Sequence, residues 1–229
     1  MRGIRNARSW PQVRLARWTP LLAAASLALG ACGGTSNVDV ESDFPTPLVS
    51  KLPVRMGVHL PEELRSFSHK EDIPRHSSWR FDLGAANVSL FEPLFVAMFD
   101  ETVPVSTIPP GSAEAAGLHG IVKPQLERFE FDVPRGRNAR FVEVWVQYRM
   151  ELYTPEGGLV AEWPVTGYGK SSASDFGQSN SLRRATIRAL REVGADLSIE
   201  FASNPDVSDW LKDIGNGSTD TSDNGVAVR

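Results

Sequence analysis

Residues 140–154 read Arg-Phe-Val-Glu-Val-Trp-Val-Gln-Tyr-Arg-Met-Glu-Leu-Tyr-Thr. Every second side chain from Val142 to Leu152 is apolar or aromatic, and most of those between them are charged or carry an amide. Successive side chains of a β-strand point to opposite faces of its sheet, so this alternation predicts a long strand with one buried face. The stretch therefore places a half-buried sheet at the centre of the fold.

The sequence on both sides of this strand predicts further strands. The segment Pro155-Glu-Gly-Gly158 favours a chain reversal, and residues 159–168 return from it, which makes a hairpin. Other candidate strands cover residues 52–60, 79–81, 102–107 and 121–133. The rest of residues 61–82 is charged and mixed in character, and we interpret it as a long loop.

A first helix is predicted for residues 84–100, where apolar residues recur at helical spacing. Pro93 lies inside this pattern and leaves two alternatives. Either it kinks the helix, or it lies in the first turns, with Ser89 as N-cap and Glu92 completing a capping box.

A second helix is predicted by an apolar stripe from Leu182 to Phe201, with capping residues at 179–181 and arginines on the other face. A short helix is expected at 205–211. The order of elements predicts an α+β fold, an antiparallel sheet of four to five strands with two main helices on one face. We expect residues 51–214 to form this single domain.

The more polar face of the 140–154 strand also carries three aromatic residues, Phe141, Trp145 and Tyr153, together with Arg149. If the helices cover the other face, these side chains lie on the open face of the sheet. Aromatic residues and arginine are typical anchors of protein interfaces, so these four residues are the candidate partner-binding site. The alternative is that a second layer covers them, for which the 61–82 segment with Trp79 is the candidate.

The N-terminal sequence has the features of a secretory signal. Five arginines and no acidic residue precede an apolar run from Thr19 to Leu29. Residues Leu29-Gly30-Ala31-Cys32 resemble the lipobox of bacterial lipoproteins. The resemblance implies a signal peptide at 1–31 and lipidation of Cys32 by a diacylglycerol and a further acyl chain such as palmitate.

Further expectations follow from the resemblance and from the composition of the two ends. Gly33, where an aspartate would favour inner-membrane retention, implies the outer membrane with the chain facing the periplasm. Small, acidic and proline residues predict a flexible lipidated tether at 32–50, and a polar, glycine-rich sequence predicts a disordered tail at 215–229.

Composition excludes several functions for the mature chain. Removing the five leader arginines from 24 basic residues leaves 19 against 28 acidic ones, a net charge of −9. Such an acidic chain argues against nucleic acid as a partner. Cys32 is the only cysteine, so its acylation leaves no thiol for disulfides, metal binding or catalysis.

Two groups of residues are candidates for a phosphate-binding site and a metal-binding site. Gly169-Lys170-Ser171 resembles the end of a phosphate-binding loop, but Pro164 stands where the first glycine is needed. His69, Glu71, Asp72 and His76 do not have the spacing of a familiar metal motif, and a solvated charged loop is the better interpretation.

The predicted function is therefore binding to another protein, without catalysis. The order of elements is similar to that of small lipoproteins that brace outer-membrane machines, such as the LPS-transport plug lipoprotein and the curli-secretion lipoprotein. We expect a brace or assembly factor that binds an envelope protein, without catalysis, cofactor or metal. The alternatives are a carrier of small ligands or lipids and, third, a cell-envelope hydrolase.

Overall fold

The computed structural model describes residues 35–41, 43–73, 78–133, 140–173 and 177–220, with side chains described up to residue 216. The predicted signal peptide and Cys32 lie outside the described residues. Among the residues that are described, no helix is long and apolar enough to cross a membrane.

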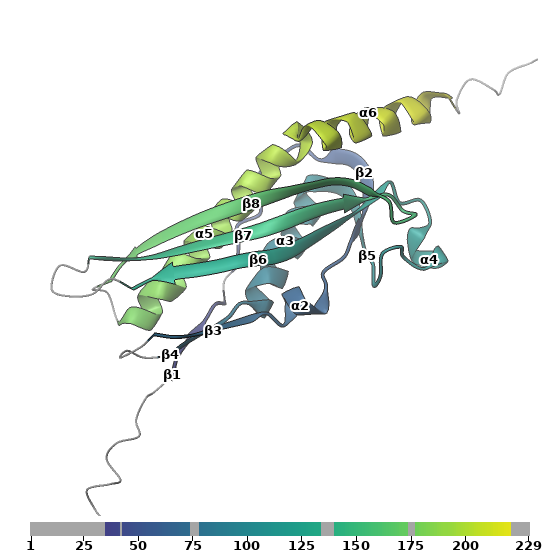
Figure 1. Cartoon of the computed structure of the whole chain (residues 1–229). Coiled ribbons are helices and arrows are strands. Elements are labelled where there is room, and N and C mark those ends of the chain that lie inside the picture. The colour runs from purple at the N-terminus through teal and green to yellow at the C-terminus, as the bar shows by residue number, and fades with distance from the viewer. Residues whose placement is uncertain (1–34, 42, 74–77, 134–139, 174–176, 221–229) are drawn as a thin grey trace, which may run out of the picture. The chain divides into compact units, whose positions relative to one another are not determined.

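A five-stranded sheet is the centre of the fold (Figure 1). Three long antiparallel strands form most of it: β6 (Gly120–Asp132), β7 (Phe141–Tyr153) and β8 (Leu159–Ser172). The shorter β2 (Leu52–Val58) pairs parallel to β6, and β5 (Phe99–Pro104) pairs parallel to β2. The strand order is β5-β2-β6-β7-β8, so the sheet is mixed where an antiparallel one was expected.

A second, three-stranded sheet was not expected. It has the order β1-β4-β3, formed by β1 (Thr35–Asp39), β4 (Ser78–Asp82) and β3 (Ser68–Asp72). The prediction of a flexible tether is therefore wrong for residues 35–39. The physical reason is burial, because Val38 and Val40 are each only 1% exposed in the core. The expected long loop at 61–82 is likewise replaced by β3, β4 and the short α2 (Glu62–Arg65).

The two main helices cover one face of the five-stranded sheet, as predicted (Figure 1). They are α3 (Gly84–Met98) and α5 (Gln178–Glu200). Because α3 begins at Gly84, Pro93 lies in its interior, and the alternative of a capping box at Ser89 is wrong. The buried stripe of α5 contains the predicted residues Leu182, Thr186, Ala189, Leu190, Val193 and Leu197.

Three further helical segments complete the described chain. They are α4 (Ser112–Ala115), the 3₁₀ turn η2 (Phe201–Ser203) and α6 (Pro205–Asp220). The helix expected at 205–211 thus continues to residue 220, which corrects the predicted start of a disordered tail at 215. Residues Val207, Trp210, Leu211 and Ile214 pack against the core at helical spacing and explain why the first turns form.

Two glycines of β8 allow α5 to lie directly on the sheet. A Cβ atom at Gly167 would come within 2.0 Å of the carbonyl oxygen of Ala189, and one at Gly169 within 1.8 Å of that of Ala185. No larger residue fits at either position without moving the helix. Gly169 therefore lies in mid-strand and packs against a helix, in agreement with our rejection of a phosphate-binding loop.

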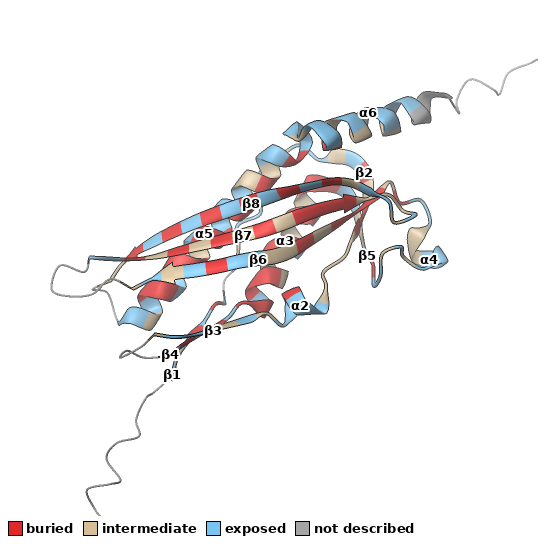
Figure 2. Cartoon of the chain, viewed as in Figure 1, coloured by how far each residue is buried: buried red, intermediate tan, exposed pale blue. Residues whose placement is uncertain are grey.

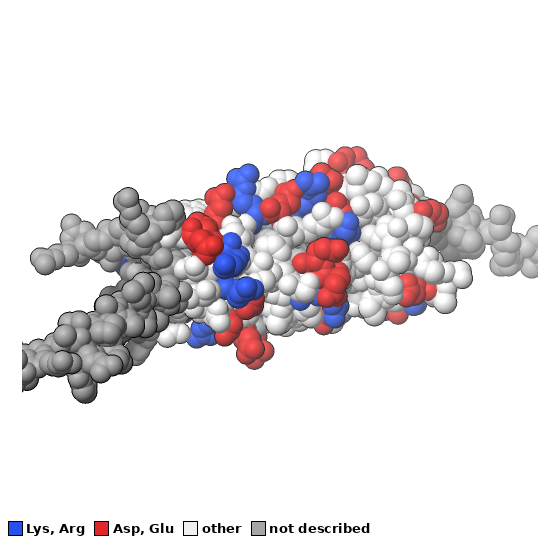
Figure 3. All heavy atoms as spheres, turned by 60° about the horizontal axis from the view of Figure 1, so that its bottom comes forward, with Lys and Arg blue, Asp and Glu red and all other residues white. Residues whose placement is uncertain are grey.

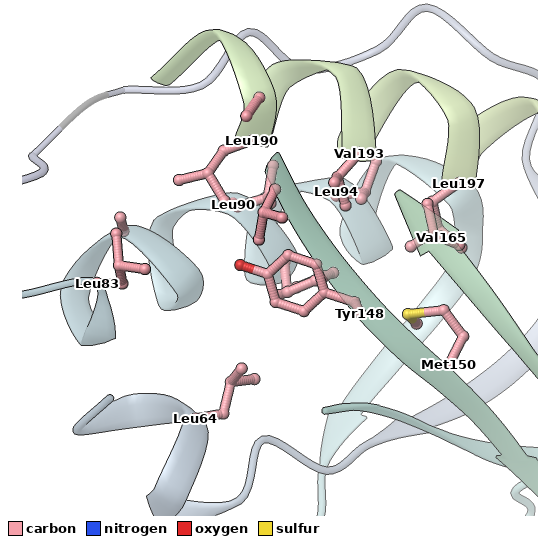
Figure 4. Close-up of a cluster of buried hydrophobic side chains, with 14 of the residues drawn as sticks. Leu64, Leu83, Leu90, Leu94, Tyr148, Met150, Val165, Leu190, Val193 and Leu197 are labelled. Atoms are coloured by element: carbon pink, nitrogen blue, oxygen red, sulfur yellow. The ribbon is translucent and has the colours of Figure 1, made fainter. Parts of the chain in front are cut away.

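Tyr148 of β7 lies among the buried hydrophobic side chains between the sheet and the helices (Figure 4). Tyr148 is fully buried, and its hydroxyl donates to Asn87 Oδ1 at 2.6 Å. The amide of Asn87 in turn donates to the carbonyl oxygen of Leu64 at 2.9 Å. Burial raises the pKa of the Tyr148 phenol. These two hydrogen bonds link β7, α3 and α2. They also give partners to polar groups whose burial without a hydrogen bond would destabilise the fold.

Candidate functional site

Along β7 and β8, buried positions alternate with exposed or half-buried ones (Figure 2). The exposed and half-buried positions lie on the face of the sheet opposite the helices and carry mostly polar and aromatic residues. We call the surface formed by its outward-facing residues on β6, β7 and β8 the open face. These residues are Lys123, Gln125, Arg128, Glu130, Phe141, Glu143, Trp145, Gln147, Arg149, Glu162, Pro164, Thr166, Tyr168 and Lys170. The described part of the chain places no helix against them, and most are exposed or half-buried.

Aromatic rings gather where β7 and β8 lie beside each other. Trp145 pairs with Tyr168 across the strands, with ring centroids 5.4 Å apart. Two residues further along, the Lys170 ammonium lies 4.4 Å from the ring centroid of Phe141. Phe141 is 45% exposed and Tyr168 is 38% exposed, so both present apolar surface to solvent. These four residues form what we call the aromatic cluster.

Glu143 fixes the positions of the cluster's polar groups. Its carboxylate accepts a hydrogen bond from the Tyr168 hydroxyl at 2.7 Å and pairs with Lys170 at 3.0 Å. The bond from Tyr168, followed by that from Lys170, holds the pKa of Glu143 below its usual value. The same carboxylate raises the pKa of both partners. The charges are thus satisfied within the face, which leaves the rings as its main unpartnered surface.

The middle of the open face is a network of ion pairs. Arg149 contacts Glu127 and lies 3.7 Å from Glu162, and Gln147 donates to Glu127 at 3.2 Å. A hollow of about 260 Å³ lies beside Trp145, between β6 and β8. In the view of Figure 3, which brings the lower side of Figure 1 forward, acidic and basic side chains are interspersed and neither sign forms a large patch. On the open face itself, Arg149 and Lys170 are each paired with a carboxylate.

The far end of this side of the sheet is covered. Tyr153 packs on a small satellite core of Val105, Leu118 and Ile121, so the segment after β5 covers it in part and leaves it half-buried. Its hydroxyl donates to Glu151 at 2.8 Å, and burial together with that bond raises the pKa of Tyr153 to about 12. Glu151 also pairs with Lys123 at 2.9 Å.

The edge of the sheet beside the open face is closed by α5. The amide of Tyr168 donates to the Glu192 carboxylate at 2.6 Å, and Arg188 donates to the carbonyl oxygen of Lys170. The backbone of Pro164, like that of Tyr168 and Lys170, points to the outer edge of β8, and a proline has no N–H that could donate to an added strand. Addition of a further strand to β8 is therefore blocked, and a partner reaches this region through the face.

The structure brings three of the four predicted partner-binding residues onto the open surface. Phe141, Trp145 and Arg149 lie there, whereas Tyr153 belongs to the covered end. The second layer weighed as an alternative does not cover them, because Trp79 is buried on the helical side and packs on Phe131. The sequence-based prediction did not include Tyr168. Its position in the strand that returns from the predicted hairpin turn was the feature that could have identified it.

The residues weighed as a metal site do not converge. His69 lies 3.5 Å from Glu71, Asp72 pairs with Lys70, and His76 lies outside the described residues. In the part of the chain that the structure describes, no group of three His, Cys, Asp or Glu side chains is placed to hold a metal ion.

Comparison with known proteins gives likeness of fold only. No family model and no curated protein match the chain. A DUF330 protein from Xanthomonas campestris is 14% identical, with a TM-score of 0.46 over 81% of this chain and 99% of that one. A homolog of a neuraminyllactose-binding hemagglutinin from Helicobacter pylori is 9% identical, with a TM-score of 0.44 over 76% and 97%.

A minor lipoprotein from Acinetobacter baumannii is 8% identical, with a TM-score of 0.39 over 69% of this chain and 95% of that one. At such identities and scores, these likenesses carry no conclusion about what this chain does.

Proposed function

We propose that this chain is a lipid-anchored envelope protein that binds a partner protein through its open face and acts as a brace or assembly factor without catalysis. The observation that carries the proposal is the aromatic cluster of Phe141, Trp145, Tyr168 and Lys170 on a sheet face that none of the described elements covers.

The chemistry of the cluster fits a protein partner. Interface anchors are most often tryptophan, tyrosine and arginine, and removing one typically costs about 2 kcal/mol or more of binding. The tilted rings of Trp145 and Tyr168 pack against each other, and Glu143 accepts a hydrogen bond from the tyrosine hydroxyl, so little side-chain freedom remains to be lost on binding. The surrounding ion pairs resemble the polar rim of a protein interface.

The anchor rests on the lipobox-like residues before and at Cys32. Acylation there would hold the chain in the outer membrane, facing the periplasm. Because β1 begins at Thr35, only Gly33 and Gly34 separate it from Cys32. Three peptide units span at most about 10 Å, so the domain would lie against the lipid surface and not at the end of a long tether.

A pair of variants tests the docking proposal in intact cells. After chemical crosslinking, the full chain is purified and its crosslinked proteins are quantified for Trp145→Ala and for Leu159→Ala. Leu159 is an equally apolar control, 56% exposed at the start of β8 and outside the cluster. We expect one partner to be lost from Trp145→Ala and kept by Leu159→Ala. Equal recovery of every partner by both variants would refute the proposal.

The anchor has its own test. Membrane fractionation of Cys32→Ala should show the chain leaving the outer-membrane fraction or remaining unprocessed. Unchanged outer-membrane fractionation would contradict lipidation at Cys32 and would leave the docking proposal standing.

A further inference from the structure

A small apolar cavity lies on the helical side of the molecule, away from the open face. Its walls come from three segments: residues 44–47 (Phe-Pro-Thr-Pro), α3 with Leu90, Pro93 and Leu94, and α5 with Gly194 and Ala195. The cavity is partly open to solvent, and its volume is about 180 Å³. Apolar cavities of about 150 Å³ in proteins stay dry and accept a ligand as large as benzene. The cavity is therefore large enough for a short stretch of hydrocarbon.

One charged residue, Arg191 of α5, lies at this cavity. Its side chain is exposed, and no hydrogen bond or ion pair joins it to another of the described residues. Two other arginines of α5, Arg184 and Arg188, are by contrast bonded to β8. The cavity thus combines apolar walls with a single unpaired cation, an arrangement that matches an amphiphile with an anionic head.

Apolar side chains also lie next to the lining residues of the cavity. Leu48 follows Pro47 directly and is fully exposed. Ile199 lies one turn after Ala195 on α5 and is 69% exposed.

The two helices form one continuous wall of the cavity. Leu90 of α3 lies beside Gly194 of α5, and the rings of Phe99 and Phe201 are 5.2 Å apart, so α3 and α5 run side by side in the same direction. The exposed Val96 of α3 does not belong to this wall, because it lines a separate hollow together with Val58 and Thr102.

We propose that this cavity binds the hydrocarbon chain of an anionic amphiphile, with its carboxylate or phosphate on Arg191. The chain enters between α3, α5 and residues 44–47 and continues over the neighbouring Leu48 and Ile199. Both a free fatty acid and an anionic phospholipid have this chemistry, and the cavity accepts the part that they share. The site is separate from the open face and does not depend on the docking function.

Photolabelling of the full chain in phosphatidylcholine vesicles tests this site. The vesicles contain a trace of one of two probes: palmitic acid with a diazirine in its chain, or phosphatidylglycerol with the same group in one acyl chain. Labelled peptides are identified by mass spectrometry. We expect label in residues 44–48, 90–94 and 191–199. The label should come from the first probe if the ligand is a fatty acid and from the second if it is a phospholipid.

Matched variants separate the cavity from general contact with lipid. Ala195→Leu fills the cavity from an exposed position and should remove most of the label, while Ala202→Leu adds the same bulk outside it and should not. Arg191→Ala should reduce labelling by up to about fivefold, the effect of one solvent-exposed ion pair. Arg183→Ala removes an exposed arginine of the same helix that does not line the cavity and should leave labelling unchanged.

Circular dichroism first establishes that each variant is folded. Equal labelling of Ala195→Leu and Ala202→Leu, or label confined to other segments with both probes, would overturn the proposal. Crosslinking of Ile199 to a protein in cells, without lipid labelling, would also overturn it. Trp145→Ala should retain full labelling, so failure of the docking proposal and failure of this one remain distinguishable.

Discussion

Replacing Gly169 by alanine should displace α5 from the sheet. The added Cβ would lie 1.8 Å from the carbonyl oxygen of Ala185 and 2.7 Å from the backbone nitrogen of Ala189. Both atoms belong to the helix backbone, so no side-chain rotation relieves the overlap. Ordinary contact begins at about 3.4 Å, and the helix must therefore retreat by about 1.6 Å at this point.

The cost follows from what that retreat opens. The buried stripe of α5, including Leu182 and Leu190, is in full contact with the core, and a gap of 0.5–1 Å already forfeits a quarter to a half of the dispersion energy. Overpacking a close-fitting site costs about 1–3 kcal/mol and sometimes more. We expect a loss near the upper end, about 3 kcal/mol. For a domain of this size, that lowers the melting temperature by roughly 6–12 °C.

Thermal unfolding followed by circular dichroism at 222 nm measures the effect. Gly158→Ala is the matched control, because a Cβ there meets its nearest atom, Thr154 Oγ1, at an ordinary 3.4 Å. The control should change stability by no more than about 1 kcal/mol. If the two variants melt at the same temperature, the close seating of α5 on β8 is wrong.

Three further predictions concern the tyrosines and Glu143. Tyr148→Phe should destabilise the fold by about 1–3 kcal/mol in urea unfolding, because Asn87 Oδ1 loses its donor inside the core; an unchanged midpoint would contradict the buried pair. All three tyrosines (Tyr148, Tyr153 and Tyr168) have raised pKa values, so absorbance at 295 nm should show the midpoint of phenolate formation in the folded chain above pH 10. A midpoint at or below pH 10 would disprove this. Because the pKa of Glu143 is lowered, its carboxylate stabilises the fold above pH 4.5 and loses that effect as the pH falls through its folded-state value. The melting temperature of Glu143→Gln should therefore depend less on pH between 5 and 3 than that of the unsubstituted chain. Equal dependence of the two melting temperatures on pH would refute the contact.

Local periodicity predicted the elements that form the core. The alternation along residues 141–153 and the helical stripe from Leu182 to Leu197 are signals within one segment, and burial on one side produces each of them. Pairing between distant segments has no such signal. The parallel pairing of β2 with β5 and β6 joins strands that each look like an ordinary apolar run.

The ends of the domain were predicted less well for a related reason. Residues 35–39 contain a single buried valine, Val38, among polar residues, so nothing in that stretch distinguishes a strand from a linker. Gly215 and Gly217 indicate the end of a helix by propensity, yet α6 continues past both. Its first turns are held by Trp210, which packs against Gly120 of β6, a contact between residues far apart in sequence.

The candidate site was predictable only in part because of one irregularity in the hairpin. Near the turn, Tyr153 lies opposite Leu159, and counting back from that pair would place Gly167 opposite Trp145. The register shifts by one residue between Leu152 and Tyr153, which brings Tyr168 to Trp145 instead. A β-bulge of this kind changes which side chains meet, and the sequence around it does not reveal its position.

The central claim is that the open face binds a partner, and site-specific crosslinking in intact cells measures this most directly. A benzophenone amino acid placed at Trp145 or at Tyr168 should form a crosslink to one and the same envelope protein. The same residue placed at Arg183, on the exposed side of α5, should not form that crosslink. Crosslinks to that protein from Arg183 alone, or none from either position on the open face, would contradict the account.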